Sequence, residues 1–94
     1  MYVISEIFPQ HGGSIQVAEQ MILQSKLAGA NAVKVQLYTA TQFGAERGYL
    51  ELSKDGLRHL KQYAEHLNID LFATPFTFDR LDWCVDLDMP YMKV

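Results

Sequence analysis

The stretch that decides the fold is AVKVQLY, at residues 32–38. Its apolar side chains are nearly continuous, which is typical of a parallel strand covered by helices and unlike an exposed hairpin strand. Ser14 and Ser53, on either side of it, are suited to begin helices, and the apolar residues that follow each serine recur at helical spacing. Gly29 and Asn68 are suited to end those two helices. A buried strand between two helices predicts an α/β fold with a parallel sheet.

The alternation of strand and helix continues along the whole sequence. Further strands are predicted at residues 2–7 and 70–76, the second breaking at Pro75, and a fourth begins at residue 91. Residues 39–52 form a predicted loop, and residues 77–87 form a third helix with four side chains directed inward: Phe78, Leu81, Cys84 and Val85. Such units build (β/α)8 TIM barrels of about 250 residues with right-handed connections, so residues 1–94 are predicted to be the N-terminal portion, about three and a half βα units, of one.

The composition narrows the classes of function. A net charge of −3 with no basic run argues against a nucleic-acid partner. No apolar run approaches the roughly 20 residues that cross a bilayer, and no secretory signal follows Met1, so we expect no membrane association and a cytoplasmic location. Cys84 is the single cysteine and lies beside Trp83 and Val85, which predicts a packed thiol without a chemical role.

Polar side chains recur on one face of the predicted strands. Because strand residues alternate between faces, Glu6, Lys34, Gln36, Thr74 and Lys93 fall opposite the helix-packing residues, near the carboxyl ends of their strands. Barrel enzymes carry their active sites at that end. Two lysines and a hydroxyl suit a phosphate or carboxylate, and the glutamate offers a base or a hydroxyl acceptor. Two alternatives stay open: Glu6 and Lys34 pair internally, or a lysine forms a Schiff base as in aldolases.

The histidines divide into two groups. His11 lies beside two glycines in the first loop after a strand, where a polar group at the rim of the active site and a plain loop residue are equally expected; Gln36 is a second candidate for that rim. His59 and His66 share a predicted helix but lack partners at metal-ligand spacing, which predicts surface histidines. No metal site is predicted within these 94 residues.

An ordered set of short motifs carries a family resemblance that runs from residue 2 to residue 94. The motifs are SEI at 5–7, His11 with Gly13, AVKVQ at 32–36, ATPF at 73–76 and PYMKV at 90–94. Together they resemble the N-acetylneuraminate (sialic acid) synthase family, the NeuB-like group that includes pseudaminic and legionaminic acid synthases. The resemblance implies a TIM-barrel transferase of carbohydrate biosynthesis. It would condense phosphoenolpyruvate with an N-acylated amino sugar, N-acetylmannosamine or similar, to give a nonulosonic acid and phosphate.

The resemblance also implies roles for individual residues. Lys34, Thr74 and Lys93 match the positions that contact phosphoenolpyruvate in the family, and Glu6 matches a catalytic glutamate near the metal and the sugar. A divalent metal, Mn²⁺ or Mg²⁺, is implied for the full-length enzyme, with its ligands beyond Val94. The rest of the barrel and a C-terminal antifreeze-like domain, through which the family forms homodimers, are also expected beyond that residue.

Two departures from the family pattern leave other functions open. Phe8 and Gln10 stand where the family has a glycine and an asparagine, on the sugar side of the site. One alternative is another phosphoenolpyruvate-dependent aldose condensing enzyme of the same barrel superfamily, with a phosphorylated acceptor. The other is a non-catalytic, sugar-phosphate-binding barrel remnant. The 94-residue piece by itself is expected to be inactive and poorly soluble, because it would leave a sheet edge open.

Overall fold

A three-stranded parallel sheet organises the chain in the computed structural model, which describes residues 1–7, 14–37, 52–75 and 77–89. The elements follow the predicted alternation: β1 (Ile4–Glu6), α1 (Ile15–Leu27), β2 (Ala32–Leu37), α3 (Lys54–His66), β3 (Asp70–Pro75) and α4 (Phe78–Asp86). β2 lies between β1 and β3 and pairs with both in parallel. The prediction of an α/β fold with a parallel sheet is confirmed, while the predicted fourth strand and the 39–51 loop lie outside the described residues.

The predicted helix boundaries are confirmed by their hydrogen bonds and dihedral angles. The Ser14 hydroxyl accepts a hydrogen bond from the Val17 amide at 3.1 Å, and the Ser53 hydroxyl accepts one from the Gly56 amide at 3.0 Å. Each serine thereby satisfies an amide that has no partner within its own helix. Beyond the other helix ends, Gly29 has φ +94° and Asn68 has φ 57°, in the left-handed region that reverses the chain toward the next strand.

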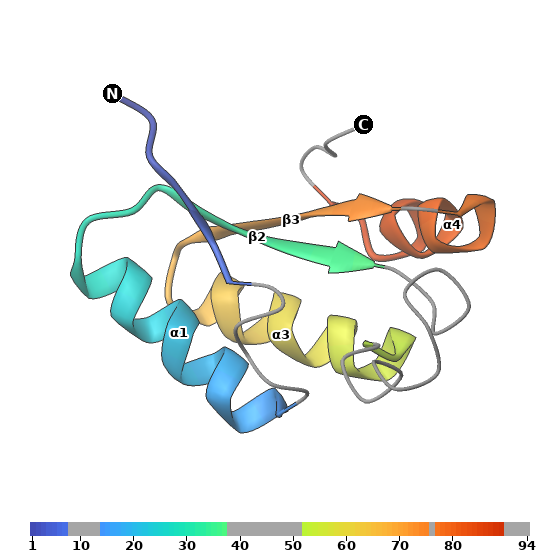
Figure 1. Cartoon of the computed structure of the whole chain (residues 1–94), viewed down its shortest axis with the longest axis horizontal. Coiled ribbons are helices and arrows are strands. Elements are labelled where there is room, and N and C mark those ends of the chain that lie inside the picture. The colour runs from blue at the N-terminus through green and yellow to red at the C-terminus, as the bar shows by residue number, and fades with distance from the viewer. Residues whose placement is uncertain (8–13, 38–51, 76, 90–94) are drawn as a thin grey trace.

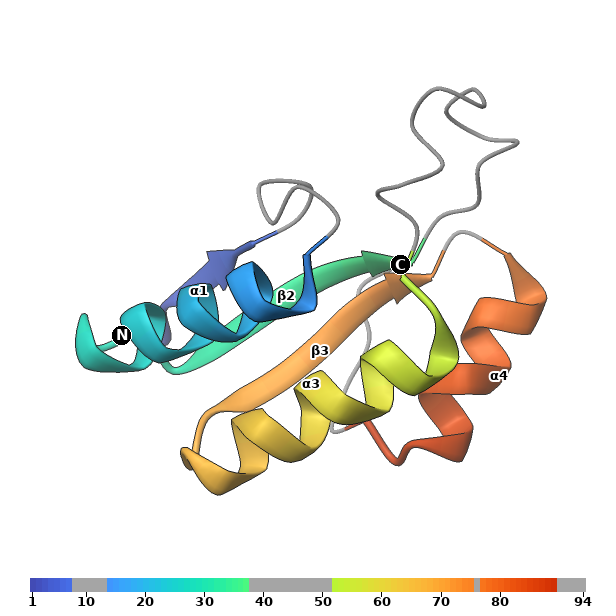
Figure 2. The same cartoon turned by 90° about the horizontal axis from the view of Figure 1, so that it is seen from below.

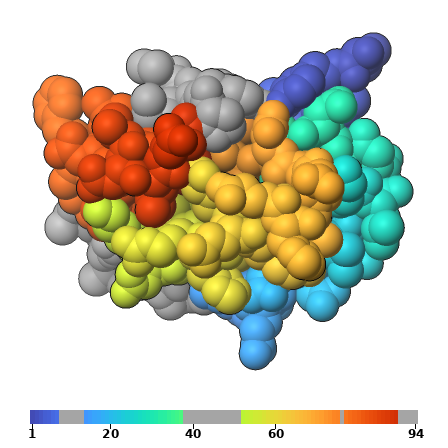
Figure 3. Space-filling view, turned by 180° about the vertical axis from the view of Figure 1, so that it is seen from behind, coloured from blue at the N-terminus to red at the C-terminus, as the bar shows by residue number. Residues whose placement is uncertain are grey.

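The main core lies between the sheet and its helices. Figure 1 shows α1 and α3 on one face of the sheet, and Figure 2 shows α4 beside α3 along the β3 side. From behind, the surfaces of α4, α3 and α1 follow one another across the molecule (Figure 3). This core contains Ile7, just after β1, and five odd-numbered residues of β2 and β3: Val33, Val35, Leu37, Leu71 and Ala73. The helices contribute Ala18, Ile22, Leu57, Leu60, Ala64 and Cys84.

β1 is shorter than predicted, although its hydrogen bonds to the β2 side extend further. The Val3 carbonyl accepts hydrogen bonds from the amides of Asn31 and Ala32, at 2.8 and 3.2 Å. At the other end, the Ile7 amide donates to the Lys34 carbonyl at 3.2 Å. The chain from Val3 to Ile7 is therefore held against β2, which fixes the position of Glu6 at the carboxyl end of β1.

The predicted inward face of α4 is wrong at two of its four positions. Cys84 is buried and Leu81 is half-buried, whereas the side chains of Phe78 and Val85 are 88% and 65% exposed. Each residue advances about 100° around a helix, so the turn that points Cys84 at the core carries Val85 to one side of it. Trp83 and Leu87 pack against the core instead.

The first turn of α4 is held by a polar cap. The Thr77 hydroxyl accepts a hydrogen bond from the Arg80 amide at 3.4 Å and donates one to the Asp79 carboxylate, which also pairs with the Arg80 guanidinium. The hydrogen bond from Thr77 and then the charge of Arg80 lower the pKa of Asp79. Arg80 also stacks over the Trp83 ring, 4.0 Å from its centroid. The charges of Asp79 and Arg80 thus stabilise the start of the helix.

Candidate functional site

The sheet register brings four of the predicted site residues onto one face. Glu6 is the pairing partner of Lys34, which in turn pairs with Phe72 on β3. Gln36 pairs with Thr74 two residues further along the strands. Paired residues of neighbouring strands lie side by side on the same face. We call this the even face, because its residues are even-numbered, whereas the strand residues that face the helix-side core are odd-numbered. For the described strands, the predicted segregation of the two sets is confirmed.

The charged row of the even face contains an ion pair. The Lys34 ammonium lies 2.8 Å from the Glu6 carboxylate oxygen Oε2, and the side chains are 13% and 35% exposed. On the other side of Lys34, Phe72 is buried, although it does not belong to the helix-side core cluster. The internal ion pair that the sequence left open as an alternative is therefore formed in this structure. It compensates the cost of placing a lysine between two strands.

The second row of the even face contains a buried hydroxyl. The Thr74 oxygen Oγ1 is shielded from solvent and has no hydrogen-bond partner among the described residues. Burial of an unsatisfied hydroxyl is unfavourable by about 1–3 kcal/mol. Such groups are found where a ligand, an ion or a water completes the hydrogen bond. Gln36, which is half-buried, is its neighbour in the register and offers an amide to the same region.

The remaining candidates fall elsewhere. Lys93 and His11, together with Phe8 and Gln10, lie outside the described residues. His59 is exposed, as predicted, but its Nε2 lies 2.7 Å from a Glu19 carboxylate oxygen and links α3 to α1, a contact between helices that spacing within one helix cannot reveal. Within the described ranges, no group of three or more His, Cys, Asp or Glu side chains is placed to hold a metal ion.

Cys84 has the structural role that its neighbours indicate. Its side chain is buried in the helix-side core, and desolvation raises the pKa of its thiol. A thiol that resists ionisation is a poor nucleophile. Cys84 therefore stays outside the candidate site, as predicted.

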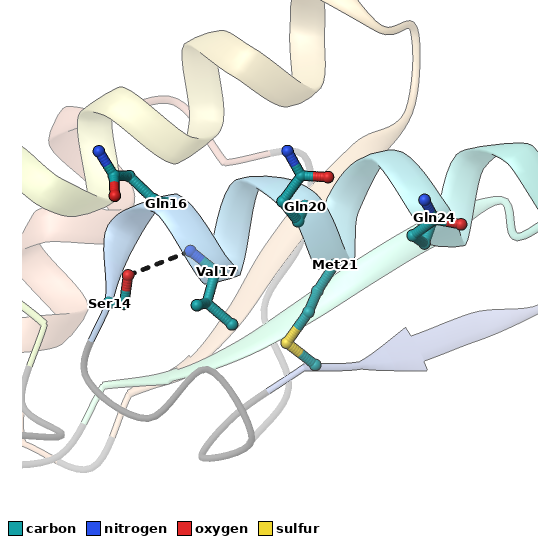
Figure 4. A pocket seen from close by; sticks show the side chains of 6 residues that line it. All are labelled: Ser14, Gln16, Val17, Gln20, Met21 and Gln24. Carbon is teal, nitrogen blue, oxygen red and sulfur yellow. Dashed lines mark hydrogen bonds between the residues drawn. The ribbon is translucent and has the colours of Figure 1, made fainter.

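A surface groove on α1 lies apart from the even face. It is lined by side chains of Ser14 and five helix residues (Figure 4): Gln16, Val17, Gln20, Met21 and Gln24. Figure 4 shows Gln16 and Gln20 on one side of the helix and Val17 and Met21 on the other. The lining carries no ionisable side chain. The groove therefore offers neither an acid or base for catalysis nor a positive charge for an anionic ligand. The even face remains the candidate site.

Part of the chain matches a protein-family model, and the whole chain resembles sugar-acid synthases. The model of the NeuB family matches residues 42–94. The chain is 28% identical over 114 residues to N-acetylneuraminate-9-phosphate synthase of Drosophila melanogaster, covering 100% of this chain and 31% of the relative. It is 25% identical over 115 residues to N,N'-diacetyllegionaminic acid synthase of Legionella pneumophila, covering 99% of this chain and 32% of that protein.

The fold also matches a solved structure. The crystal structure of N-acetylneuraminic acid (sialic acid) synthetase from Leptospira borgpetersenii serovar Hardjo-bovis, in complex with citrate, is 30% identical with a TM-score of 0.88. The match covers 99% of this chain and 35% of the synthetase, so the chain has the fold of part of that TIM barrel. It spans about a third of the length of its relatives. No helix in the described ranges is long and apolar enough to cross a membrane. The family model, the relatives and the shared fold agree that this chain belongs to the NeuB family.

Proposed function

We propose that the protein condenses phosphoenolpyruvate with an N-acylated amino sugar, N-acetylmannosamine or a similar aldose, and releases a nonulosonic acid and phosphate. The observation that carries the proposal is the even face, where a lysine, an amide and an unsatisfied hydroxyl lie in two adjacent rows of the sheet. Membership of a family whose named relatives are synthases of N-acetylneuraminate-9-phosphate and of N,N'-diacetyllegionaminic acid supports the substrate class. The solved relative holds citrate, a polyanion.

Each residue has a distinct part in this proposal. The Lys34 ammonium and that of Lys93 hold the anionic groups of phosphoenolpyruvate, and the Thr74 hydroxyl donates a hydrogen bond to one of its oxygens. A fixed pose brings C3 of phosphoenolpyruvate within reach of the sugar aldehyde carbon, where the new carbon–carbon bond forms. A water molecule adds to C2 of phosphoenolpyruvate as the aldehyde oxygen takes up a proton. The tetrahedral C2 then collapses to a ketone and expels phosphate by cleavage of the bond between C2 and the bridging oxygen. Glu6 lies beside Lys34 and orients the sugar or moves a proton.

A divalent metal is part of the proposal for the whole enzyme. Bound there, Mn²⁺ or Mg²⁺ would polarise the sugar aldehyde. The described residues do not by themselves supply a set of metal ligands, and the carboxylate of Glu6 is already paired with Lys34. The metal therefore depends on residues outside those ranges. We also propose that the whole enzyme is a homodimer acting in the cytoplasm.

The test is phosphate release by the intact protein. We expect release that requires phosphoenolpyruvate, an amino sugar and a divalent metal together, and loss of this activity in Lys34→Met. The matched control is Lys54→Met, which removes a lysine that pairs with Asp86 at 2.7 Å, between α3 and α4. Activity that survives Lys34→Met would contradict the assigned role of the even face.

A phosphorylated acceptor is the second candidate, because the relatives from Drosophila melanogaster and Homo sapiens are named for a 9-phosphate product. Assays with N-acetylmannosamine and with its 6-phosphate separate the two candidates. Binding of phosphoenolpyruvate without release of its phosphate in the presence of either acceptor would instead identify a non-catalytic remnant.

A further inference from the structure

The Glu6–Lys34 ion pair has a consequence for ligand binding on the even face. In the ligand-free protein the Lys34 ammonium is already in contact with a carboxylate, at 2.8 Å. If this lysine binds an anionic substrate, as proposed above, the substrate arrives next to the negative charge of Glu6. The Glu6 carboxylate and the substrate then both contact the Lys34 ammonium. Two anions that contact the same ammonium lie close to each other, and like charges at short distance repel strongly where solvent is partly excluded.

The Glu6 carboxylate and a bound anion compete for the Lys34 ammonium, and only one of the two strands next to Lys34 places a charged residue beside it. The ion pair is only part-exposed, so water screens it less than it screens a surface pair. On the β3 side, the pairing partner of Lys34 is the apolar Phe72, which is buried. On the β1 side it is Glu6. The carboxylate is held there by the hydrogen bonds that fix β1 against β2, from Val3 to Ile7.

We propose that Glu6 limits the affinity of the even face for anions, so that phosphoenolpyruvate binds reversibly and the product phosphate is released. This inference rests on the proposed function and deepens it. In the empty site, Glu6 holds the Lys34 ammonium in position through the ion pair. When an anion binds, Glu6 weakens its hold, and the weakening applies to the product phosphate as well as to the substrate. Glu6 thereby tunes binding in addition to any part it has in proton transfer.

The test measures dissociation constants of phosphoenolpyruvate and of inorganic phosphate for the intact protein by calorimetry, at fixed ionic strength. Glu6→Gln removes the charge and keeps the shape of the side chain. We expect it to bind both anions about tenfold more tightly, the order expected when a like charge beside a part-buried anion is removed. Inhibition by product phosphate should strengthen in parallel. A loss of turnover alone would not produce this tightening, so the two roles of Glu6 are separable.

The matched control is Asp86→Asn, which makes the same change in net charge. It also breaks a lysine–carboxylate pair, with Lys54 at 2.7 Å, but one located between α3 and α4. We expect no change in either dissociation constant. Equal tightening in both variants would overturn the inference in favour of a long-range charge effect. Weakening in Glu6→Gln would overturn it too, because Glu6 would then serve to position Lys34 for the anion.

A third variant separates the inference from the function on which it rests. Lys34→Met should weaken binding of both anions. If Lys34→Met binds phosphoenolpyruvate as wild type does, or if wild type does not bind it, the proposed function and this inference both fail. If Lys34→Met loses binding while Glu6→Gln does not gain it, the proposed function stands and the inference alone fails.

Discussion

Replacement of Thr74 by valine is expected to stabilise the ligand-free protein while weakening its substrate binding. The hydroxyl oxygen of Thr74 is shielded from solvent and unpaired among the described residues. Valine has nearly the same shape, retains a β-branched side chain in a strand and removes the unsatisfied group. Relief of a penalty at the lower end of about 1–3 kcal/mol predicts a gain of about 1 kcal/mol in the free energy of unfolding.

The same substitution removes a donor to the bound anion. A hydrogen bond to a charged group contributes about 1.5–3 kcal/mol, so the dissociation constant of phosphoenolpyruvate should rise at least about tenfold. Urea denaturation of the ligand-free intact protein measures the first effect, and calorimetric titration measures the second. Opposite signs for stability and affinity identify a hydroxyl that is kept for a ligand.

Thr77→Val is the matched control. It makes the same chemical change at a hydroxyl that caps α4 and is fully engaged by the Arg80 amide and the Asp79 carboxylate. Loss of this cap should lower the free energy of unfolding by about 1 kcal/mol and leave the affinity for phosphoenolpyruvate unchanged. If Thr74→Val destabilises the protein as Thr77→Val does and binds phosphoenolpyruvate normally, the Thr74 hydroxyl has a structural partner and the argument is refuted.

Three further predictions concern the helix side of the sheet. Leu60 is fully buried, so Leu60→Ala should lower the free energy of unfolding by about 2–5 kcal/mol in urea denaturation, whereas Leu27→Ala, at a 71% exposed position, should change it little. Burial raises the pKa of Cys84 above its ordinary 9.0, so on raising the pH the unfolded chain loses this proton before the folded one does. The free energy of unfolding should therefore be unaffected by this thiol below about pH 9 and fall above it. A Cys84 thiol that reacts with a thiol reagent as fast in the native protein as in the unfolded one would contradict this. Gly29→Ala should cost about 1 kcal/mol through left-handed strain alone, because a Cβ there would meet nothing within 4 Å, and Gly29→Asn should cost less.

The sequence predicts the fold well because its strongest signals are local. A serine before a periodic apolar stripe and a glycine or asparagine after it mark the helix ends, and the structure confirms them at Ser14, Gly29, Ser53 and Asn68. The two-residue period of the strands separates Lys34 and Gln36 from Val33 and Val35. Such patterns depend on a few neighbouring residues and need no knowledge of tertiary contacts.

The features that the sequence did not predict depend on contacts between elements. Phe78 and Val85 are apolar at a spacing of seven residues, which suits a buried helix stripe, yet both are exposed in the described structure, since the orientation of α4 is set by the packing of Cys84 and Trp83. From the sequence, the pairing of Glu6 with Lys34 is one interpretation beside an anion site and a Schiff-base lysine. The register of β1 on β2, which brings the two charges together, depends on tertiary contacts that the sequence pattern does not reveal. The placement of Lys93 and His11 stays a prediction.

The alternation within β2 has a consequence for how this chain can change over generations. Val33, Val35 and Leu37 lie in the core between sheet and helices, while Lys34 and Gln36 lie on the opposite face with the candidate site. Selection on substitutions at the odd positions therefore acts mainly through the stability of the fold. Selection at Lys34 and Gln36 acts mainly through ligand binding and catalysis. One short segment thus contains two nearly independent mutational targets, and new specificities can be explored on one side of a single strand without eroding the packing that supports it.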